Sequence, residues 1–321
     1  MELNHYMPPE KNPVHSMVAH HDSIDFVRIN EKTSSPQIVS ASHDDTFKIW
    51  DLEKKSLVNS CHAHNQGVFC CDISPNGKQI ATCSPDQTVA VWDSSNCSQV
   101  ARGTAHTYKV YFVTYVSESQ LVSCGRDKNV FLWDVRNMSS PAKSYQVSGN
   151  GTFRSVALSP DRSTLIATTA ESAVEGFNFE SGERIFEHKV DYDLSVFPAD
   201  KQWLVEPAII YVARFFKDNS FLTCHQDMAI RKFQLTPSGP QQTGILRNHL
   251  DFVRHIEISE NEDIFVSTSQ DGSARIWDVS SATPIWNLVG HNQIASCAAI
   301  TSDSKTIVTS SYDQSLKIYR L

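Results

Sequence analysis

The stretch HDDTFKIWD, residues 43–51, decides the fold of this chain because variants of it recur along the sequence. The clearest copies are PDQTVAVWD (85–93), RDKNVFLWD (126–134) and QDGSARIWD (270–278), and weaker ones are QDMAIRKFQ (226–234) and YDQSLKIYR (312–320). At spacings of 41 to 56 residues, the aromatic position of the phrase is occupied by Trp50, Trp92, Trp133, Phe177, Phe233, Trp277 and Tyr319. This period predicts seven copies of one supersecondary unit, which bury their faces against one another.

Each unit is predicted to contain four short strands. In the second unit the candidate strands are VFCCDIS (68–74), QIATCS (79–84), TVAVWD (88–93) and SQVARG (98–103). The turns between them are rich in Pro, Asn, Asp and Gly, which is typical of antiparallel hairpins. No long segment has the periodicity of an amphipathic helix, so the chain is predicted to be all-β.

Three polar columns accompany the aromatic one. A His stands near the start of most units, at His20, His64, His106, His249 and His291. A Ser or Thr lies four residues before an Asp, and the aromatic residue lies six residues after that Asp. With these four columns, residues 13–321 resemble the WD-repeat family. The resemblance implies a seven-bladed β-propeller in which each blade is a four-stranded antiparallel sheet.

The His, hydroxyl and Asp of one unit are also the groups that a hydrolase uses. An enzyme needs one such set with an exposed nucleophile, whereas this set recurs in unit after unit. Repetition favours a buried hydrogen-bond network, in which each polar group needs a partner to offset its loss of water. We therefore predict a structural role, and no catalytic role, for His20, Ser40, Asp44, Trp50, His64, Thr82, Asp86, Trp92, His106, Ser123, Asp127, Trp133, His249, Ser267, Asp271 and Trp277.

The fourth and fifth units depart from this pattern. In the four columns the fourth unit has Gly149, Ala167, Glu171 and Phe177, so its network is predicted to be absent. The fifth has Val205 in the His column and follows an insertion within residues 188–207. Phe197 and Trp203 lie in this insertion, outside the columns. They are predicted to form a second contact surface, with covering of the fourth unit's flank as the alternative.

The two ends of the chain predict how the ring closes. Residues 1–12 are expected to form a short N-terminal tail, and residues 13–321 a single seven-bladed domain. Only two residues follow Tyr319, so the last unit lacks its fourth strand. The segment PVHSMVAH (13–20) matches PIWNLVGH (284–291) in the preceding unit. An N-terminal strand at about 13–19 is therefore predicted to complete the last blade.

Composition limits the classes of partner. The net charge is −8 and no run of five basic residues occurs, so sequence-specific nucleic acid binding is not expected. No apolar run is long enough to span a bilayer, which predicts no membrane insertion, and the N-terminus lacks a secretory h-region. A cytoplasmic location is expected, with nuclear or cytoskeletal sites as alternatives and without secretion. No glycine-rich phosphate loop occurs, and no cofactor is expected.

The eight cysteines raise the alternatives of a disulfide or a zinc site. Three of them occupy a column of small residues, which indicates a packing role: Cys83, Cys124 and Cys224. Another cluster offers potential zinc ligands: Cys61, His62, His64, Cys70 and Cys71. Because this cluster fits the repeat register and no CxxC pair occurs, no metal site is predicted.

The resemblance implies a rigid disc that binds proteins or peptides. In this family, the residue before the Asp and those three and five after the His tend to line one face around the channel. Aromatic and Arg side chains are the usual anchors of protein interfaces. For a partner with acidic and apolar groups, the predicted contact residues are Phe69, Lys109, Tyr111, Arg126, Arg154, Phe252, Arg254 and Tyr312.

These observations predict a non-catalytic protein–protein interaction scaffold, a monomeric propeller inside a larger hetero-complex. One alternative is a substrate receptor of a cullin-type ubiquitin ligase. Trp133-Asp134-Val135-Arg136 is similar to the WDxR box of such receptors, and Arg136 then contacts the adaptor. A hydrolase is a third alternative, which the recurrence of the polar set disfavours.

Overall fold

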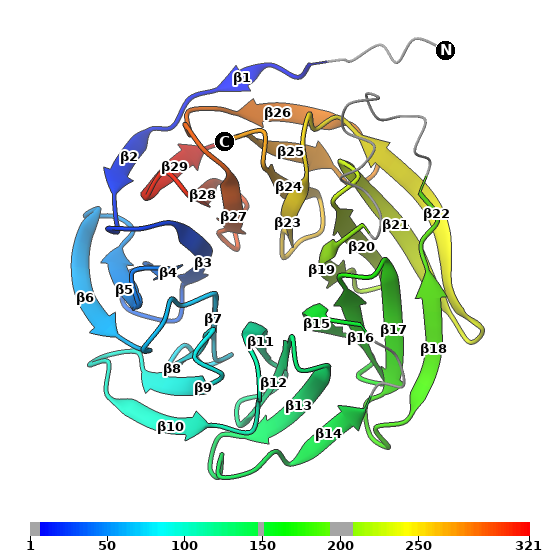
Figure 1. The fold of residues 1–321 in the computed structure, drawn as a ribbon. Coiled ribbons are helices and arrows are strands. Elements are labelled where there is room, and N and C mark those ends of the chain that lie inside the picture. The colour runs from blue at the N-terminus through cyan, green and yellow to red at the C-terminus, as the bar shows by residue number, and fades with distance from the viewer. Residues whose placement is uncertain (1–6, 147–150, 193–207) are drawn as a thin grey trace.

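Seven sheets surround a central axis in the computed structural model, which describes residues 7–146, 151–192 and 208–321 (Figure 1). Within these ranges the chain forms no α-helix, and accordingly none that is long and apolar enough to cross a membrane. Each sheet has four antiparallel strands, and one sheet gains a fifth. The prediction of an all-β, seven-bladed propeller is confirmed.

The strands are numbered along the chain and the blades by their inner strands. The inner strands, in blades 1 to 7, are β3 (Ile24–Asn30), β7 (Cys70–Ile73), β11 (Val110–Tyr115), β15 (Phe153–Leu158), β19 (Ile210–Phe215), β23 (Val253–Ile258) and β27 (Ala295–Ile300). The second strands are β4 (Gln37–Ser42), β8 (Gln79–Cys83), β12 (Gln120–Gly125), β16 (Thr164–Thr169), β20 (Ser220–His225), β24 (Ile264–Ser269) and β28 (Thr306–Ser311). The third strands are β5 (Thr46–Asp51), β9 (Val89–Asp93), β13 (Asn129–Asp134), β17 (Ala173–Asn178), β21 (Ala229–Thr236), β25 (Ala274–Asp278) and β29 (Ser315–Arg320). The outer strands are β6 (Ser56–His62), β10 (Gln99–Gly103), β14 (Lys143–Gln146), β18 (Arg184–Lys189), β22 (Gly239–Arg247), β26 (Pro284–Leu288) and β2 (His15–Val18).

The N-terminal segment closes the ring in two steps. Strand β2 pairs antiparallel with β29, where Met17 faces Leu316, so the predicted completion of the last blade is confirmed. Before that, β1 (Glu10–Lys11) adds a parallel fifth strand to β26 of blade 6. Figure 1 shows this blue segment passing outside β26 before it reaches β29. The segment predicted as a tail therefore contributes a strand and bridges the last two blades.

The core lies between neighbouring blades, where both faces of each sheet are covered. Every residue of the second strands β16 and β20 is buried. In contrast, the outer strand β6 has only one buried residue, Cys61. The cysteines of the small-residue column, Cys83, Cys124 and Cys224, have no exposed surface. Small side chains in this column permit close stacking of one blade on the next.

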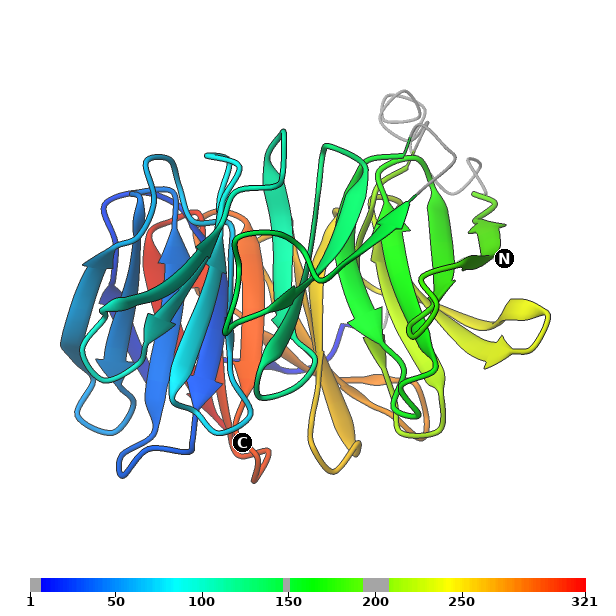
Figure 2. The same cartoon turned by 90° about the horizontal axis from the view of Figure 1, so that it is seen from below.

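Six of the seven inner strands share an irregularity that shapes the upper mouth of the channel. The upper face is the one that carries the second-to-third turns and the connections from each outer strand to the next blade (Figure 2). The pairing register shifts directly after the first residue of β3, β11, β15, β19, β23 and β27. Such a bulge leaves one residue unopposed and redirects its side chain. The unopposed residues are Asp25, Tyr111, Arg154, Tyr211, Arg254 and Ser296.

Candidate functional site

Five blades contain the same buried network of a His, a hydroxyl residue and an Asp. In blade 3, His106 Nδ1 lies 2.8 Å from Asp127 Oδ2, and His106 Nε2 lies 2.7 Å from Ser123 Oγ. The Trp133 indole N–H donates to the same Ser123 Oγ at 2.8 Å. The main-chain N–H of Thr107 donates to Asp127 at 3.1 Å. The hydroxyl thus has two partners and does not act as a free nucleophile.

The remaining four networks repeat this geometry. The distances from His Nδ1 to the Asp oxygen are 2.9–3.1 Å, and those from His Nε2 to the hydroxyl are 2.7–2.8 Å. The groups are His20, Ser40 and Asp44 in blade 1, His64, Thr82 and Asp86 in blade 2, His249, Ser267 and Asp271 in blade 6, and His291, Thr309 and Asp313 in blade 7. Three indoles donate to these hydroxyls at 2.8–3.0 Å: Trp50, Trp92 and Trp277.

The charge states in these networks follow from burial and hydrogen bonding. Burial lowers the pKa of four imidazoles, which favours their neutral form: His20, His64, His249 and His291. Burial also opposes ionisation of Asp86, but hydrogen bonds from His64 and Thr88 outweigh it and hold the pKa of that carboxyl well below its usual range. A neutral imidazole donates from Nδ1 to the carboxylate and accepts at Nε2 from the hydroxyl. In each blade the His lies on the connection before the inner strand, the hydroxyl on the second strand and the Asp in the turn that follows it. Each network therefore holds these three segments of the blade together.

Blade 5 replaces the missing His with a different arrangement. His225 Nε2 lies 2.6 Å from Thr223 Oγ1, and His225 Nδ1 lies 3.1 Å from Tyr192 Oη. Asp227 accepts two hydrogen bonds from the Arg231 guanidinium, at 2.8 and 2.5 Å. Burial lowers the pKa of His225 to about 3. The hydroxyl and the carboxylate are therefore satisfied by residues that the column pattern did not single out.

Within the residues that the structure describes, blade 4 keeps one contact of the network. Glu171, in place of the Asp, accepts a hydrogen bond from the Thr152 main-chain N–H at 2.7 Å. Phe177, in place of the Trp, packs against Tyr145 with ring centroids 5.8 Å apart. The column residue Gly149 lies outside the described residues. Other buried polar contacts take part in this blade, such as that between Ser155 Oγ and Thr168 Oγ1 at 2.9 Å.

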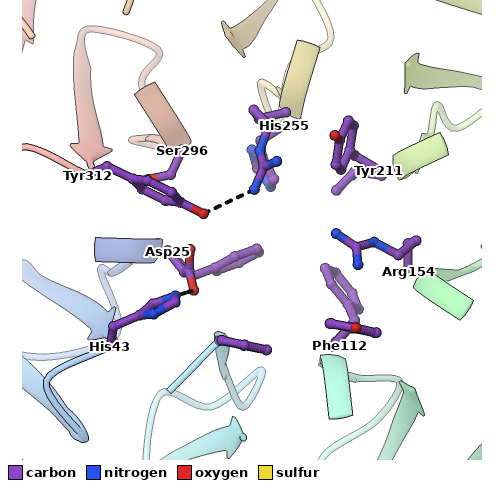
Figure 3. Close-up of a pocket in the computed structure, with 13 residues that line it drawn as sticks. Asp25, His43, Phe112, Arg154, Tyr211, His255, Ser296 and Tyr312 are labelled. Carbon is purple, nitrogen blue, oxygen red and sulfur yellow. Dashed lines mark hydrogen bonds and ion pairs between the residues drawn. The ribbon is translucent and has the colours of Figure 1, made fainter. Parts of the chain in front are cut away.

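A ring of seven side chains, one from each blade, surrounds the upper mouth of the channel. We call it the collar, and its members in blade order are His43, Phe69, Tyr111, Arg154, Tyr211, Arg254 and Tyr312. Each member contacts the next, and the ring is continuous. Consecutive aromatic centroids lie 5.2–6.2 Å apart, and guanidinium carbons lie 4.3–5.9 Å from the adjoining ring centroids. Figure 3 shows several members pointing into the pocket from different blades.

The two arginines of the collar are held by aromatic faces. The Arg154 guanidinium carbon lies 4.3 Å from the Tyr111 centroid and 5.6 Å from that of Tyr211. The Arg254 guanidinium carbon lies 4.5 Å from the Tyr211 centroid, and Arg254 Nη2 donates to Tyr312 Oη at 3.2 Å. Cation–π contacts of this kind orient a guanidinium without neutralising it. Burial and then the neighbouring charge of Arg254 lower the pKa of Arg154.

The acidic residue of the pocket is already paired. Asp25 Oδ2 lies 2.5 Å from His43 Nε2, and this hydrogen bond raises the pKa of His43. Figure 3 places the Asp25–His43 pair across the pocket from Arg154. Ser296, the serine that lines the pocket, donates from Oγ to the Ile24 carbonyl at 2.5 Å. The pocket thus presents two cations and several aromatic edges, and its serine is engaged with the main chain.

An apolar floor lies directly below the collar. Phe26 contacts Phe112 and His255, with ring centroids 5.8 and 5.1 Å apart. Burial lowers the pKa of His255 well below its usual value, so this ring is neutral. The pocket above this floor has a volume of about 170 Å³. This volume suits one side chain better than a cofactor, since sites for drug-sized ligands span about 300–1,000 Å³.

Ion pairs join the blades one layer further down. Arg28 Nε lies 3.3 Å from Asp72 Oδ1, and Arg28 Nη1 lies 3.3 Å from Glu257 Oε2. Arg214 Nε lies 3.3 Å from the same Glu257 oxygen. Two cations and two anions balance one another here. The pocket therefore opens toward the upper face, with the apolar floor and this balanced layer beneath it.

The structure brings five of the eight predicted contact residues into the collar: Phe69, Tyr111, Arg154, Arg254 and Tyr312. The other three lie beside it on the upper face. Lys109 and Arg126 are exposed and adjacent, and the Arg126 main-chain N–H donates to the Lys109 carbonyl at 2.9 Å. Phe252 is half-buried against the apolar cluster that includes Tyr211.

The predicted contact set missed two collar members and the floor. His43 stands in the column before the Asp, but it is neither an arginine nor one of the usual aromatic anchors. When Val205 is taken as the column His, the position five residues later is Ile210, and Tyr211 lies one residue beyond it. The bulge supplies a better reference, because Tyr211 is the unopposed residue of β19. The floor residues Phe112 and His255 directly follow unopposed residues in their strands.

The remaining candidate surface residues lie away from the collar. Arg136, of the WDxR box, follows the lower end of β13, and its side chain is 77% exposed. Its Nε donates to Asp134 Oδ1 at 2.9 Å. Phe197 and Trp203, predicted as a second surface, lie outside the described residues.

The cysteines are distributed between one bridge and the core. A disulfide joins Cys61 of blade 1 to Cys97 in the turn after β9 of blade 2, a pairing that the sequence did not predict. The zinc alternative included Cys61, which this bridge engages, and Cys70 and Cys71, which are buried on β7. His64 belongs to the blade 2 network. These candidate ligands therefore have separate structural environments.

Comparison with known proteins agrees with the architecture. The profile of the family described as "WD domain, G-beta repeat" matches residues 11–51, 55–93, 97–134, 240–278 and 282–320, more than half of the chain. The long unmatched segment, 135–239, contains blade 4 and the first three strands of blade 5.

Similarity to individual proteins is lower. Striatin from Homo sapiens is 25% identical over 307 residues, which cover 88% of this chain and 38% of striatin. Apoptotic protease-activating factor 1 from Rattus norvegicus is 21% identical over 168 residues, 52% of this chain and 12% of that protein. Denticleless protein homolog B from Xenopus laevis is 36% identical over 108 residues, 32% of this chain and 15% of that protein. The chain spans about two fifths of the length of the striatin that it matches.

Proposed function

The chain belongs to the WD domain, G-beta repeat family, and on this premise we propose that it is a non-catalytic scaffold for protein–protein interaction. The observation that carries the proposal is the collar, a continuous ring of five aromatic and two Arg side chains around an open pocket. Aromatic and Arg residues dominate the energetic centres of protein interfaces. Because four collar members lie on inner strands and His43, Phe69 and Tyr312 lie directly beside strand ends, a partner would bind with little ordering cost.

The upper-face residues outside the collar extend this proposed surface. Lys109 and Arg126 add exposed positive charge beside blades 3 and 4. Phe252 adds partly exposed apolar area near blade 6. The Arg and Lys side chains and the aromatic rings of this surface suit a partner segment with acidic and apolar groups. The propeller would act as one monomeric subunit of a larger hetero-complex, and proteins or peptides are its proposed partners.

The polar groups near the collar support a binding role over a catalytic one. The network hydroxyls are buried and engaged by imidazole and indole groups, as for Ser123 with His106 and Trp133. The pocket hydroxyl of Ser296 is engaged by a carbonyl. Nucleophilic catalysis needs a hydroxyl or thiol that is accessible and paired with a base. Turnover of ester or peptide substrates by the purified chain would contradict the proposal.

Affinity capture with a matched pair of variants tests the scaffold proposal. The wild-type chain and the Tyr111→Ala/Arg126→Ala double variant are used as baits, and bound proteins are quantified by mass spectrometry. Arg320→Ala is the control, because Arg320 is an exposed arginine at the lower end of β29. We expect a set of proteins to be lost from the double variant and retained by the control. Identical sets from all three baits would refute the proposed upper-face surface.

A substrate receptor of a cullin-type ubiquitin ligase is the second candidate function. The observation that favours it is the exposure of Arg136 on the lower face, which leaves the collar face open to a substrate. In this arrangement the adaptor and the substrate would bind opposite faces of one rigid disc. Binding of a purified cullin adaptor, abolished by Arg136→Asp, would support this function. Absence of adaptor binding by the wild-type chain would exclude it.

A cytoplasmic location is retained as part of the proposal. Six cysteines are buried free thiols, as reducing compartments permit. The Cys61–Cys97 bridge, in contrast, is of a kind that such compartments usually reduce. Differential alkylation of thiols in intact cells, followed by peptide mapping, measures how much of the chain carries this bridge. A fully oxidised pair would contradict a purely cytosolic location.

A further inference from the structure

We propose that the pocket inside the collar binds one acidic side chain, an Asp or Glu carboxylate presented by a partner peptide. This inference rests on the proposed function, because it specifies the chemical group that the collar face recognises. It commits to a peptide carboxylate as the occupant. A phosphoryl group and an uncharged side chain are the alternatives that the experiment separates.

The first support is the state of the two guanidinium groups. Arg154 and Arg254 are half-buried, and their contacts within the described residues are with tyrosines. No carboxylate lies within ion-pair distance of either one among those residues. Other inner-strand arginines do have such partners, as Arg28 has in Asp72 and Glu257. Neither collar cation thus has an ion-pair partner among the described residues, whereas the cations of the layer below do, and the carboxylate that lines the pocket, Asp25, is hydrogen-bonded to His43.

The second support is the placement of the two guanidinium groups relative to each other. Both adjoin the same Tyr211 ring, with guanidinium carbons 5.6 Å and 4.5 Å from its centroid. The two carbons are therefore at most about 10 Å apart, as the triangle inequality of these distances requires. A carboxylate has two oxygens that can each accept a charge-assisted hydrogen bond from a separate guanidinium. The aromatic contacts hold Arg154 and Arg254 in place before any ligand binds.

The third support is the fit of a single side chain. The pocket volume of about 170 Å³ suits one inserted side chain. Phe112 and Val212 line the pocket and offer apolar contact to the methylene groups of a Glu or Asp. A cationic side chain would meet Arg154 and Arg254 without a free carboxylate, since Asp25 is paired with His43. The lining therefore favours an anion with a short aliphatic stem.

The surroundings favour a carboxylate over a phosphoryl dianion. Asp25 lines the same pocket, and its negative charge would repel a dianion more strongly than a monoanion. Exposed Lys109 and Arg126 on the adjoining blade 3 can instead attract further acidic residues of the same peptide. The expected ligand is thus an acidic segment that inserts one carboxylate and lays its neighbours over blades 3 and 4.

Position-fixed peptide arrays test the inference. The probes are five sets of nonapeptides with randomised flanks, whose central residue is fixed as Glu, Asp, Gln, Lys or phosphoserine. The labelled full-length chain is applied to each set, and the strongest Glu-centred peptide is then titrated in solution with its Gln-centred counterpart. A charge-assisted hydrogen bond contributes about 1.5–3 kcal/mol, so the Glu-centred peptide should bind at least about tenfold more tightly. The preference should weaken at high salt.

Variants assign the preference to the collar. Arg154→Gln and Arg254→Gln are each expected to abolish the tenfold difference between the two peptides. Arg320→Gln removes the same charge from the lower face and should retain it. Arg154→Lys keeps a cation in the pocket and should retain part of the preference, which separates loss of charge from loss of folding. Circular dichroism of each variant verifies the β-sheet structure.

Several outcomes would overturn the inference. Equal binding of the Glu and Gln sets, or no binding to any set, would refute the acidic-side-chain site. Selective binding of the phosphoserine set would replace the carboxylate with a phosphoryl ligand. A preference that survives both Arg154→Gln and Arg254→Gln would place the site elsewhere. None of these results affects the scaffold proposal, which the loss of captured proteins in Tyr111→Ala/Arg126→Ala tests separately.

Discussion

Replacing Asp227 by Asn is expected to destabilise blade 5 strongly. Asp227 has no exposed surface, and it pairs with Arg231, whose side chain is 1% exposed. The carboxylate oxygens lie 2.8 and 2.5 Å from the two terminal nitrogens of Arg231. Arg247 Nη2 adds a further contact at 3.3 Å. Asparagine keeps the size of the side chain but leaves the buried Arg231 guanidinium without its counter-ion.

The magnitude follows from the cost of an unpaired buried charge. Removing one partner of a buried ion pair costs about 3–5 kcal/mol. For a chain of 321 residues, an unfolding entropy of about 2.1 cal/mol/K per residue sums to roughly 0.7 kcal/mol/K. The melting temperature should therefore fall by about 4–7 °C. Replacing both partners, as Asp227→Leu/Arg231→Met, should recover part of the stability relative to Asp227→Leu alone, because the fully buried Arg231 charge is then removed and only the partly exposed Arg247 remains.

Differential scanning calorimetry measures this change, and a matched surface pair supplies the control. Asp134 forms a similar short-range pair with Arg136, whose side chain is 77% exposed. Asp134→Asn should leave the melting temperature almost unchanged, because solvent screens an exposed pair. Equal shifts for Asp227→Asn and Asp134→Asn would refute the reasoning. A shift below about 1 °C for Asp227→Asn would also refute it, because it would show that Arg231 finds compensation elsewhere.

Three further predictions concern stability. Burial lowers the pKa of His225 to about 3, whereas the same residue in the unfolded chain binds a proton near pH 6.5. The stability that this neutral His225 contributes is therefore fully present above pH 6.5 and is lost as the pH falls toward 3. Urea titrations should show the unfolding free energy falling by about 1.4 kcal/mol per pH unit from this group, and an unchanged slope in His225→Gln would contradict it. The Cys61–Cys97 bridge spans a sequence separation of 36 residues, for which loop-closure entropy gives a stabilisation of about 4 kcal/mol. Cys61→Ser should therefore lower the melting temperature under non-reducing conditions, and the variant and the wild type should melt alike after reduction. Gly103→Ala would place a Cβ 2.5 Å from the Trp133 ring, and denaturant titrations should show the unfolding free energy reduced by about 1–3 kcal/mol. Gly244→Ala is the control, because the atom nearest to its Cβ is 3.9 Å away and the unfolding free energy should not change.

The repeat columns predicted the fold because each column corresponds to a local, recurring contact. The Ser40 hydroxyl bonds Trp50 and His20 within one blade, and the same spacing reproduces that contact in the next. Contacts between blades carry no such signature. Cys61 and Cys97 meet because two neighbouring blades pack side by side, and their spacing in the sequence does not indicate it. Strand β1 escaped prediction for a similar reason, since a two-residue parallel pairing leaves no periodic pattern.

The collar was partly predictable because counting from the His reaches it wherever that His exists. Arg254 lies five residues after His249 and was found in this way. Tyr211 was missed because blade 5 has no column His, and its network is formed by His225 instead. The continuity of the collar could not be predicted, because it depends on contacts across blades, such as the 4.5 Å approach of the Arg254 guanidinium to the Tyr211 ring.

The network and the collar vary independently along the chain, and this has a consequence for function. Blades 4 and 5 have lost most or all of the standard network, yet they supply Arg154 and Tyr211 to the collar in register with the other blades. The bulge that positions these side chains is a property of main-chain pairing and places no demand on the side chain itself. Collar residues can therefore change without disturbing main-chain pairing, whereas a blade that loses network residues must satisfy its remaining polar groups in another way, as blade 5 does with His225 and Arg231. The chemistry of the collar consequently reports on the partner, and its two arginines, which have no ion-pair partner among the described residues, are better explained by what binds this face than by what holds the propeller together.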